Sequence, residues 1–183
     1  YGDSARGFMI SMAVVAVTLI VVLAAVAFTI FAGNVLKIGG CSFFIKNRTM
    51  TGTFGNLLDG FKSGHYGNVV KTMLFYDLYI ALWSLLLVVP GIIKSYEYRM
   101  VPYILAENPG MDSKQVFEIS KRMMNGQKME TFILDLSFIG WILLSAITCG
   151  IVGIFYVNPY REATFAELYA FNKAKAYEEG YIR

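Results

Sequence analysis

The most constraining feature of this sequence is a run from Gly7 to Leu36 that contains no Asp, Glu, Lys, Arg or His. A second such run extends from Leu136 to Tyr160. About 20 apolar residues suffice for a helix to cross the hydrocarbon core of a bilayer, so either run is long enough. The 183-residue chain is 56% hydrophobic and 16% charged, against about 25% charged residues in soluble domains. A soluble domain of this length could not bury so much apolar surface, and the sequence therefore predicts an integral membrane protein.

One sequence phrase occurs twice inside the apolar sequence. An Asp-Leu pair is followed by a tryptophan and a Leu-Leu pair, first at residues 77–86 and again at 135–144. A glycine turn and then a Pro-Tyr pair follow each copy. Such repetition indicates one structural unit used more than once, here a helical hairpin in the membrane. A fainter similarity between residues 33–37 and 157–161 indicates a degenerate third copy.

The predicted fold is all-α: a polytopic membrane bundle of about six hydrophobic segments, built from two or three parallel helical-hairpin repeats with cytosolic interfacial helices. The predicted turn and kink residues are Pro90, Gly91, Pro102, Gly150 and Pro159, because proline and glycine break helices. The chain forms one membrane domain, 1–183, with hairpin modules at about 7–46, 53–107 and 112–170 and a tail at 171–183. The segments cover about 8–32, 35–45, 69–89, 92–106, 129–147 and 150–168.

Two linkers are predicted to form helices that lie in the membrane surface with their apolar faces down. The second linker helix begins at the N-cap residue Asp112 and ends at Gly126. Its apolar residues recur near helical spacing: Val116, Phe117, Ile119, Met123 and Met124. The first linker carries a similar stripe: Phe54, Leu57, Leu58 and Phe61.

Basic residues predict the orientation of the chain in the membrane. Twelve of the sixteen Lys and Arg residues fall on one side of the predicted segments, which the positive-inside rule makes cytoplasmic. The opposite turns, near Gly33, Gly91 and Gly150, contain almost no charge. Both termini are therefore expected in the cytoplasm. The twelve residues are Arg6, Lys46, Arg48, Lys62, Lys71, Lys114, Lys121, Arg122, Lys128, Lys173, Lys175 and Arg183.

Three stretches carry a resemblance to a known family: residues 82–94 (LWSLLLVVPGIIK), 123–128 (MMNGQK) and 136–141 (LSFIGW). The chain resembles an uncharacterised family of bacterial integral membrane proteins, frequent in Firmicutes, whose members have about six hydrophobic segments. The resemblance covers most of the chain from about Asn34 to Tyr169. It implies a polytopic protein of the bacterial plasma membrane and no particular activity.

Charged residues within the predicted segments are the candidate functional residues, because an ion inside a membrane is costly unless it is paired or lines water. On helical geometry, Asp135 and Arg161 lie roughly 6 Å apart along the axis of one hairpin. We therefore expect Asp135 to pair with Arg161, or Asp77 to pair with Arg161 across modules. Such pairs either hold helices together or line a polar cavity for a solute or proton. The candidate network comprises Asp77, Asp135, Lys94, Glu97, Arg99, Arg161 and Glu162.

No conventional catalytic, cofactor or metal pattern is present in the sequence, in which His65 is the single histidine. The favoured function is a non-enzymatic scaffold, accessory subunit or envelope-homeostasis factor. Its expected partners are membrane lipids and a protein at the cytosolic face. Nucleic acid is not expected, because topology and anionic lipid account for the basic residues. The alternatives are a solute or lipid transporter or channel, and an intramembrane enzyme in which Asp77 and Asp135 share a proton.

Overall fold

The computed structural model describes the backbone of residues 2–182 and the side chains from residue 6 onward. Arg183, which was predicted to be cytoplasmic, lies outside the described residues. All regular structure in that part is helical. The elements are α1 (Gly2–Phe28), η1 (Thr29–Gly33), α2 (Asn34–Asn47), η2 (Phe54–Leu58), α3 (Asp59–Lys62), α4 (Tyr66–Leu86), α5 (Val88–Glu97), α6 (Val101–Glu107), α7 (Ser113–Met123), α8 (Lys128–Ser137), α9 (Ile139–Ile147), η3 (Gly153–Val157) and α10 (Asn158–Glu178). Both η1 and η3 are π-helical turns, whereas η2 is a 3₁₀ helix.

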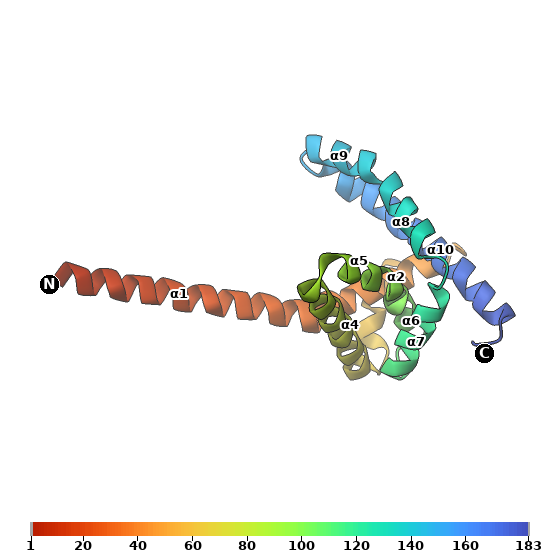
Figure 1. Cartoon of the computed structure of the whole chain (residues 1–183), viewed down its shortest axis with the longest axis horizontal. Helices are drawn as coiled ribbons and strands as arrows, with labels where there is room; N and C mark the ends of the chain where they lie inside the picture. Colours follow the sequence, from red (N-terminus) through yellow and green to blue (C-terminus); the bar gives the residue numbers. More distant parts are fainter. Residues whose placement is uncertain (1, 183) are drawn as a thin grey trace.

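The first helix is continuous where a turn was predicted. Gly33 has helical dihedrals (φ −58°, ψ −47°), and η1 joins α1 to α2, so that Arg6–Asn47 is one 42-residue helix. The hairpin predicted at 7–46 is therefore wrong. No proline follows Gly33, and a wider π turn absorbs the local irregularity without stopping the helix. Figure 1 shows α1 projecting away from the other helices, and every residue from Arg6 to Thr29 is exposed.

The second apolar helix, α4, ends at Leu86, four residues before Pro90 of the predicted Pro90-Gly91 turn. Leu87 is extended (φ −158°, ψ 139°) and reverses the chain, and α5 then packs back along α4. Pro90 lies in the first turn of α5, where no backbone N–H is needed. Gly91 is buried against α4: a Cβ atom there would lie 2.7 Å from the Ser84 Cα. Glycine is thus required where the two helices approach most closely.

We expect Gly91→Ala to lower the free energy of unfolding by about 1–3 kcal/mol, because the added methyl group must push α5 away from the Ser84 backbone. Gly140→Ala is the matched control. A Cβ atom at Gly140 meets nothing within 4 Å, so this change should be neutral or stabilising by up to about 1 kcal/mol. Thermal unfolding in a non-ionic detergent measures both. Equal stability of the two variants would contradict the close approach.

The last hairpin has its turn where it was predicted. Its outgoing arm is α8 and α9, and Cys149 (φ 50°) and Gly150 (φ 85°) reverse the chain. Gly150 thus supplies the left-handed conformation that glycine adopts at little cost. The returning arm contains η3 just before Pro159, which is the second residue of α10. A π turn before proline accommodates its missing N–H without breaking the helix.

The fourth predicted segment, 92–106, divides into two short helices. Tyr98, Arg99 and Met100 form a turn between α5 and α6, and Pro102 opens the first turn of α6. The kink predicted at Pro102 is therefore a full break that lies a few residues before it. Within the described part of the chain, three helices are long and apolar enough to cross a membrane, namely Arg6–Asn47, Tyr66–Leu86 and Lys128–Ile147.

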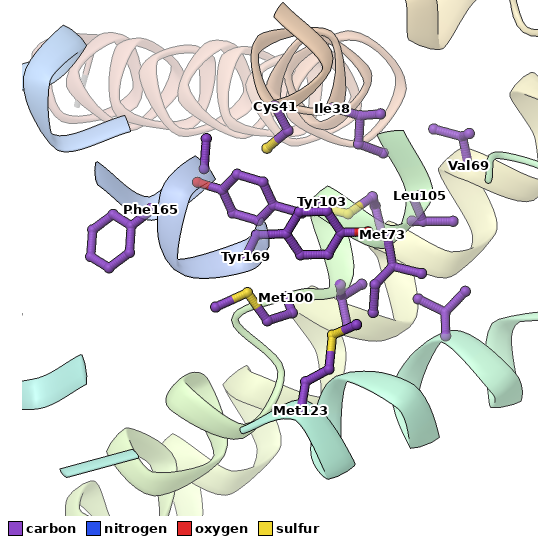
Figure 2. Packing of buried hydrophobic residues seen from close by; sticks show 14 of the residues in the cluster. Ile38, Cys41, Val69, Met73, Met100, Tyr103, Leu105, Met123, Phe165 and Tyr169 are labelled. Carbon is purple, nitrogen blue, oxygen red and sulfur yellow. The ribbon is translucent and has the colours of Figure 1, made fainter. Parts of the chain in front are cut away.

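The buried core gathers at one end of the apolar helices. It combines α2, the first turns of α4, α6, α7 and the middle of α10. Figure 2 shows the Tyr103 and Tyr169 rings stacked at its centre, with centroids 5.5 Å apart, below Cys41 of α2. The Tyr169 hydroxyl donates to Glu107 Oε2 at 2.7 Å. Burial, together with the Glu107 carboxylate, raises the pKa of that hydroxyl.

The second linker helix, α7, packs part of its apolar stripe into this core. Asp112 caps it as predicted, its carboxylate accepting a hydrogen bond from the Lys114 backbone N–H at 3.0 Å. Val116 and Met123 of its apolar stripe are buried against α6 and α10. The prediction that this apolar stripe faces lipid is therefore wrong for Val116 and Met123. In the first linker, by contrast, Phe54 of η2 is 83% exposed, and its contact with lipid stays a prediction.

Candidate functional site

The candidate site is centred on Asp135, two turns into α8. Its carboxylate accepts hydrogen bonds from three side chains on two other segments. Arg99 donates from Nη1 to Oδ2 (3.1 Å) and from Nη2 to Oδ1 (3.3 Å). Arg161 of α10 donates from Nη2 to Oδ1 at 2.9 Å, and the Tyr96 hydroxyl donates to Oδ2 at 2.9 Å. The predicted pair of Asp135 and Arg161 is present, and Arg99 is an additional partner.

Local backbone structure explains why Arg99 reaches this carboxylate. It lies in the turn between α5 and α6, so its side chain is not confined to the face of either helix. The guanidinium lies 3.9 Å from the centroid of the Phe165 ring, which holds it by a cation–π contact. Arg161 approaches the same ring at 5.6 Å. The cluster therefore joins the end of the middle hairpin to both arms of the last hairpin.

A second charged cluster is centred on Glu97, at the end of α5. This side chain is only 5% exposed and accepts hydrogen bonds from Lys94 Nζ (2.8 Å) and Lys128 Nζ (2.9 Å). The Ser120 hydroxyl of α7 donates to the Glu97 carbonyl oxygen at 2.9 Å. The sequence analysis placed Lys94 and Glu97 in the candidate network. It used Lys128 only as one of the basic residues that predict the orientation of the chain in the membrane. The pairing depends on the placement of α8 beside α5, for which the sequence carried no signal.

Asp77 belongs to neither cluster. Its carboxylate accepts a hydrogen bond from Asn34 Nδ2 at 2.6 Å, and the predicted alternative pair with Arg161 is absent. Asn34 follows the π turn η1, just as Asn158 follows η3. Sequence reasoning did not identify Asn34 as a partner, although the faint similarity between 33–37 and 157–161 was a signal that could have pointed to it. Two aspartates at equivalent positions in the repeated phrase therefore have different partners.

A cavity of about 220 Å³ lies beside the Asp135 cluster. Lys37 of α2, Arg99 and Arg161 contribute three positive charges to its wall, and Glu162 contributes one negative charge. Lys37 lies over the Tyr76 ring, 4.9 Å from its centroid, and is exposed. The Tyr103 hydroxyl donates to Glu162 Oε2 at 3.4 Å. The full lining comprises Lys37, Cys41, Tyr76, Ser95, Arg99, Pro102, Tyr103, Arg161, Glu162 and Phe165.

Over residues 2–182, the fold and the site define a helical protein with three helices long and apolar enough to cross a membrane and with charged clusters that join them to neighbouring helices. The chain belongs to a family described as protein of unknown function (DUF975), whose model matches residues 6–175. The predicted membership of an uncharacterised family is thus confirmed, over a longer part of the chain than its motifs indicated. The comparisons with curated proteins and with solved structures gave no match.

Proposed function

We propose that this protein is a non-enzymatic, multi-pass protein of the bacterial plasma membrane that acts as a scaffold or accessory subunit through its cytosolic face. The observation that carries the proposal is the packing of α7. Because Val116 and Met123 are buried in the core, the opposite face of this helix points outward. That exposed face is polar and charged: Lys114, Gln115, Glu118, Lys121 and Arg122. Charged side chains are costly in the hydrocarbon of a bilayer, so we place this face in water, where a protein partner can reach it.

A groove of about 460 Å³ runs between α7 and the C-terminal residues. Ile119 and Ile182 give it apolar walls, and Arg122 lies over the Tyr181 ring at 5.8 Å. Apolar and aromatic residues beside an arginine are the combination that recurs at the energetic centres of protein interfaces. The groove therefore provides a specific place for the cytosolic partner.

Site-specific photo-crosslinking in cells tests this proposal. A photoreactive residue at Gln115, in the groove, should yield a discrete protein adduct. The same residue at Lys62, exposed on α3 away from the groove, is the matched control and should not yield that adduct. Identical adducts at both positions, or none at Gln115 in a folded and well-expressed protein, would contradict a partner site at α7.

One observation bears on an intramembrane enzyme, and another bears on transport as the second candidate function. Asp77 and Asp135 bind different groups, and no hydrogen bond joins them among the described residues, which argues against a proton-sharing pair. The charged cavity favours transport of a small solute or lipid as the second candidate. Proteoliposomes that move no labelled phosphate, amino acid or phospholipid faster than protein-free vesicles would remove that candidate.

The continuous first helix changes the proposed orientation of the chain. Arg6–Asn47 contains 42 residues, so it is roughly 63 Å long, about twice the thickness of the hydrocarbon core. Arg6 and Lys46 then lie on opposite sides of the membrane. Since Lys46 and the other linker lysines face the cytoplasm, we propose that Arg6 lies outside the cell and the end of α10 in the cytoplasm, in place of the cytoplasmic position predicted for both.

Native Cys149 allows a direct test of this orientation. It is exposed in the turn of the last hairpin, whereas Cys41 is buried. We expect a membrane-impermeant maleimide to label Cys149 in intact cells. In a Cys149→Ser background, Gly7→Cys should also be labelled in intact cells, and Lys62→Cys only after permeabilisation. Protection of Gly7→Cys in intact cells would place this end of α1 in the cytoplasm and contradict the proposed orientation.

A further inference from the structure

The cavity beside Asp135 carries more positive than negative charge. Lys37, Arg99 and Arg161 line it, against Glu162 in the wall and Asp135 behind the two arginines. One positive charge remains in excess. The three cations come from α2, from the turn before α6 and from α10, so they face the cavity from different directions.

The donors of this cavity are only partly used by the protein. Arginine has five N–H donors, and Arg161 donates only from Nη2 to Asp135. Its Nε atom is buried and has no hydrogen-bond partner. A buried donor left without an acceptor is unfavourable, by about 1–3 kcal/mol or more for a charged group. Lys37 Nζ likewise makes no ion pair among the described residues and lies over the Tyr76 ring.

The volume of the cavity and its position beside exposed apolar residues restrict the kind of ligand that it can bind. A cavity of about 220 Å³ is smaller than the roughly 300–1,000 Å³ of pockets that enclose whole small molecules, so it suits one ionic group. Exposed apolar residues adjoin its lining, with Leu36 next to Lys37 and Ile92 one turn from Ser95. An anionic group in the cavity could therefore be attached to an apolar chain outside it.

We propose that this cavity binds a phosphate group, held by Lys37, Arg99 and Arg161. A tetrahedral phosphate offers oxygens in several directions, which matches cations on three segments better than a planar carboxylate does. Asp135 and Phe165 hold the two arginines in place before binding, so little side-chain ordering is left for the ligand to bring about. The phosphate is that of a phospholipid headgroup or free inorganic phosphate. The site is independent of the partner groove at α7.

Binding can be measured with purified protein in a phosphate-free, non-ionic detergent by isothermal titration calorimetry. The probes are dihexanoyl phosphatidylglycerol, inorganic phosphate, and dihexanoylglycerol as the phosphate-free control. Saturable binding of the phospholipid alone identifies a headgroup site, and binding of both phosphate compounds identifies a site for free phosphate. Either result supports the proposal. No binding of either compound, or equal binding of dihexanoylglycerol, overturns it.

Three variants assign the binding to this cavity. Lys37→Gln should weaken phosphate binding about tenfold or more, since one charge-assisted hydrogen bond is lost while the Asp135 cluster stays intact. Lys71→Gln is the matched control, because this exposed lysine of α4 does not line the cavity. The affinity of this variant for phosphate should equal that of the native protein. Glu162→Gln removes the negative charge from the wall and should tighten binding. Equal affinities of Lys37→Gln and Lys71→Gln would exclude the cavity as the phosphate site.

Discussion

Replacing Asp135 with asparagine should lower the free energy of unfolding by about 3 kcal/mol. Asp135 is 17% exposed and Arg99 is 22% exposed, so the substitution leaves a cation partly buried without its counter-ion. Removing one partner of a buried pair costs about 3–5 kcal/mol. The lower end applies here because Arg161, at 36% exposure, is partly stabilised by solvent.

The matched control is the same substitution at the equivalent position of the repeat. Asp77 accepts a hydrogen bond only from the neutral Asn34 side chain, and an asparagine at position 77 keeps a carbonyl oxygen to accept it. We expect Asp77→Asn to change stability by less than about 1 kcal/mol. Chemical unfolding in mixed micelles measures both variants. Equal losses of stability would show that Asp135 is not the more important of the two aspartates.

The same substitution also separates the two roles considered for the charged residues. If Asp135 only holds helices together, phosphate binding by the folded protein should survive its replacement. Gly140→Ala can recover up to about 1 kcal/mol of the roughly 3 kcal/mol lost, because an added methyl group meets no other atom and favours the helix. A double variant, Asp135→Asn with Gly140→Ala, that is folded under the conditions of the titration but has lost phosphate binding would place Asp135 in the binding site as a positioning residue.

Sequence reasoning located the Asp135–Arg161 pair because both residues belong to one hairpin, and the position of its turn at Gly150 fixes their relative depth. Arg99 could not be assigned to the same carboxylate. Its position depends on the break between α5 and α6, and the sequence marked only Pro102, which follows that break. The residues of a local hairpin could thus be paired from the sequence, whereas contacts between hairpins could not.

Two errors have a common physical origin. An apolar stripe on a helix has the same pattern whether it faces lipid or a protein core, so the stripe of α7 did not reveal that Val116 and Met123 are buried in protein. In the same way, glycine permits a turn but does not require one. Gly33 remains helical, whereas Gly150 adopts a positive φ. The surroundings of each residue, more than its type, determined whether the stripe faces protein or lipid and whether the glycine lies in a helix or a turn.

After Asp135, Glu97 should be the charged residue whose substitution lowers the free energy of unfolding most. Its side chain is 5% exposed and binds both Lys94 and Lys128, so Glu97→Gln places an uncharged amide between two ammonium groups. We expect a loss of about 2 kcal/mol in the free energy of unfolding, which is less than for Asp135. The two lysines are 22% and 34% exposed, and their flexible chains can move toward water in a way that the arginines held by Phe165 cannot.

Glu118→Gln is the matched control for this prediction. Glu118 pairs with Arg122 on the exposed face of α7, where both side chains are more than half exposed. Exposed pairs at this helical spacing contribute about 0.3–0.5 kcal/mol, so the control should lose no more than that. A double variant, Glu97→Gln with Lys128→Met, should lose less than the sum of its single changes, because the lysine has already lost its partner. Strict additivity would mean that the Glu97–Lys128 contact does not contribute to the packing of α5 against α8.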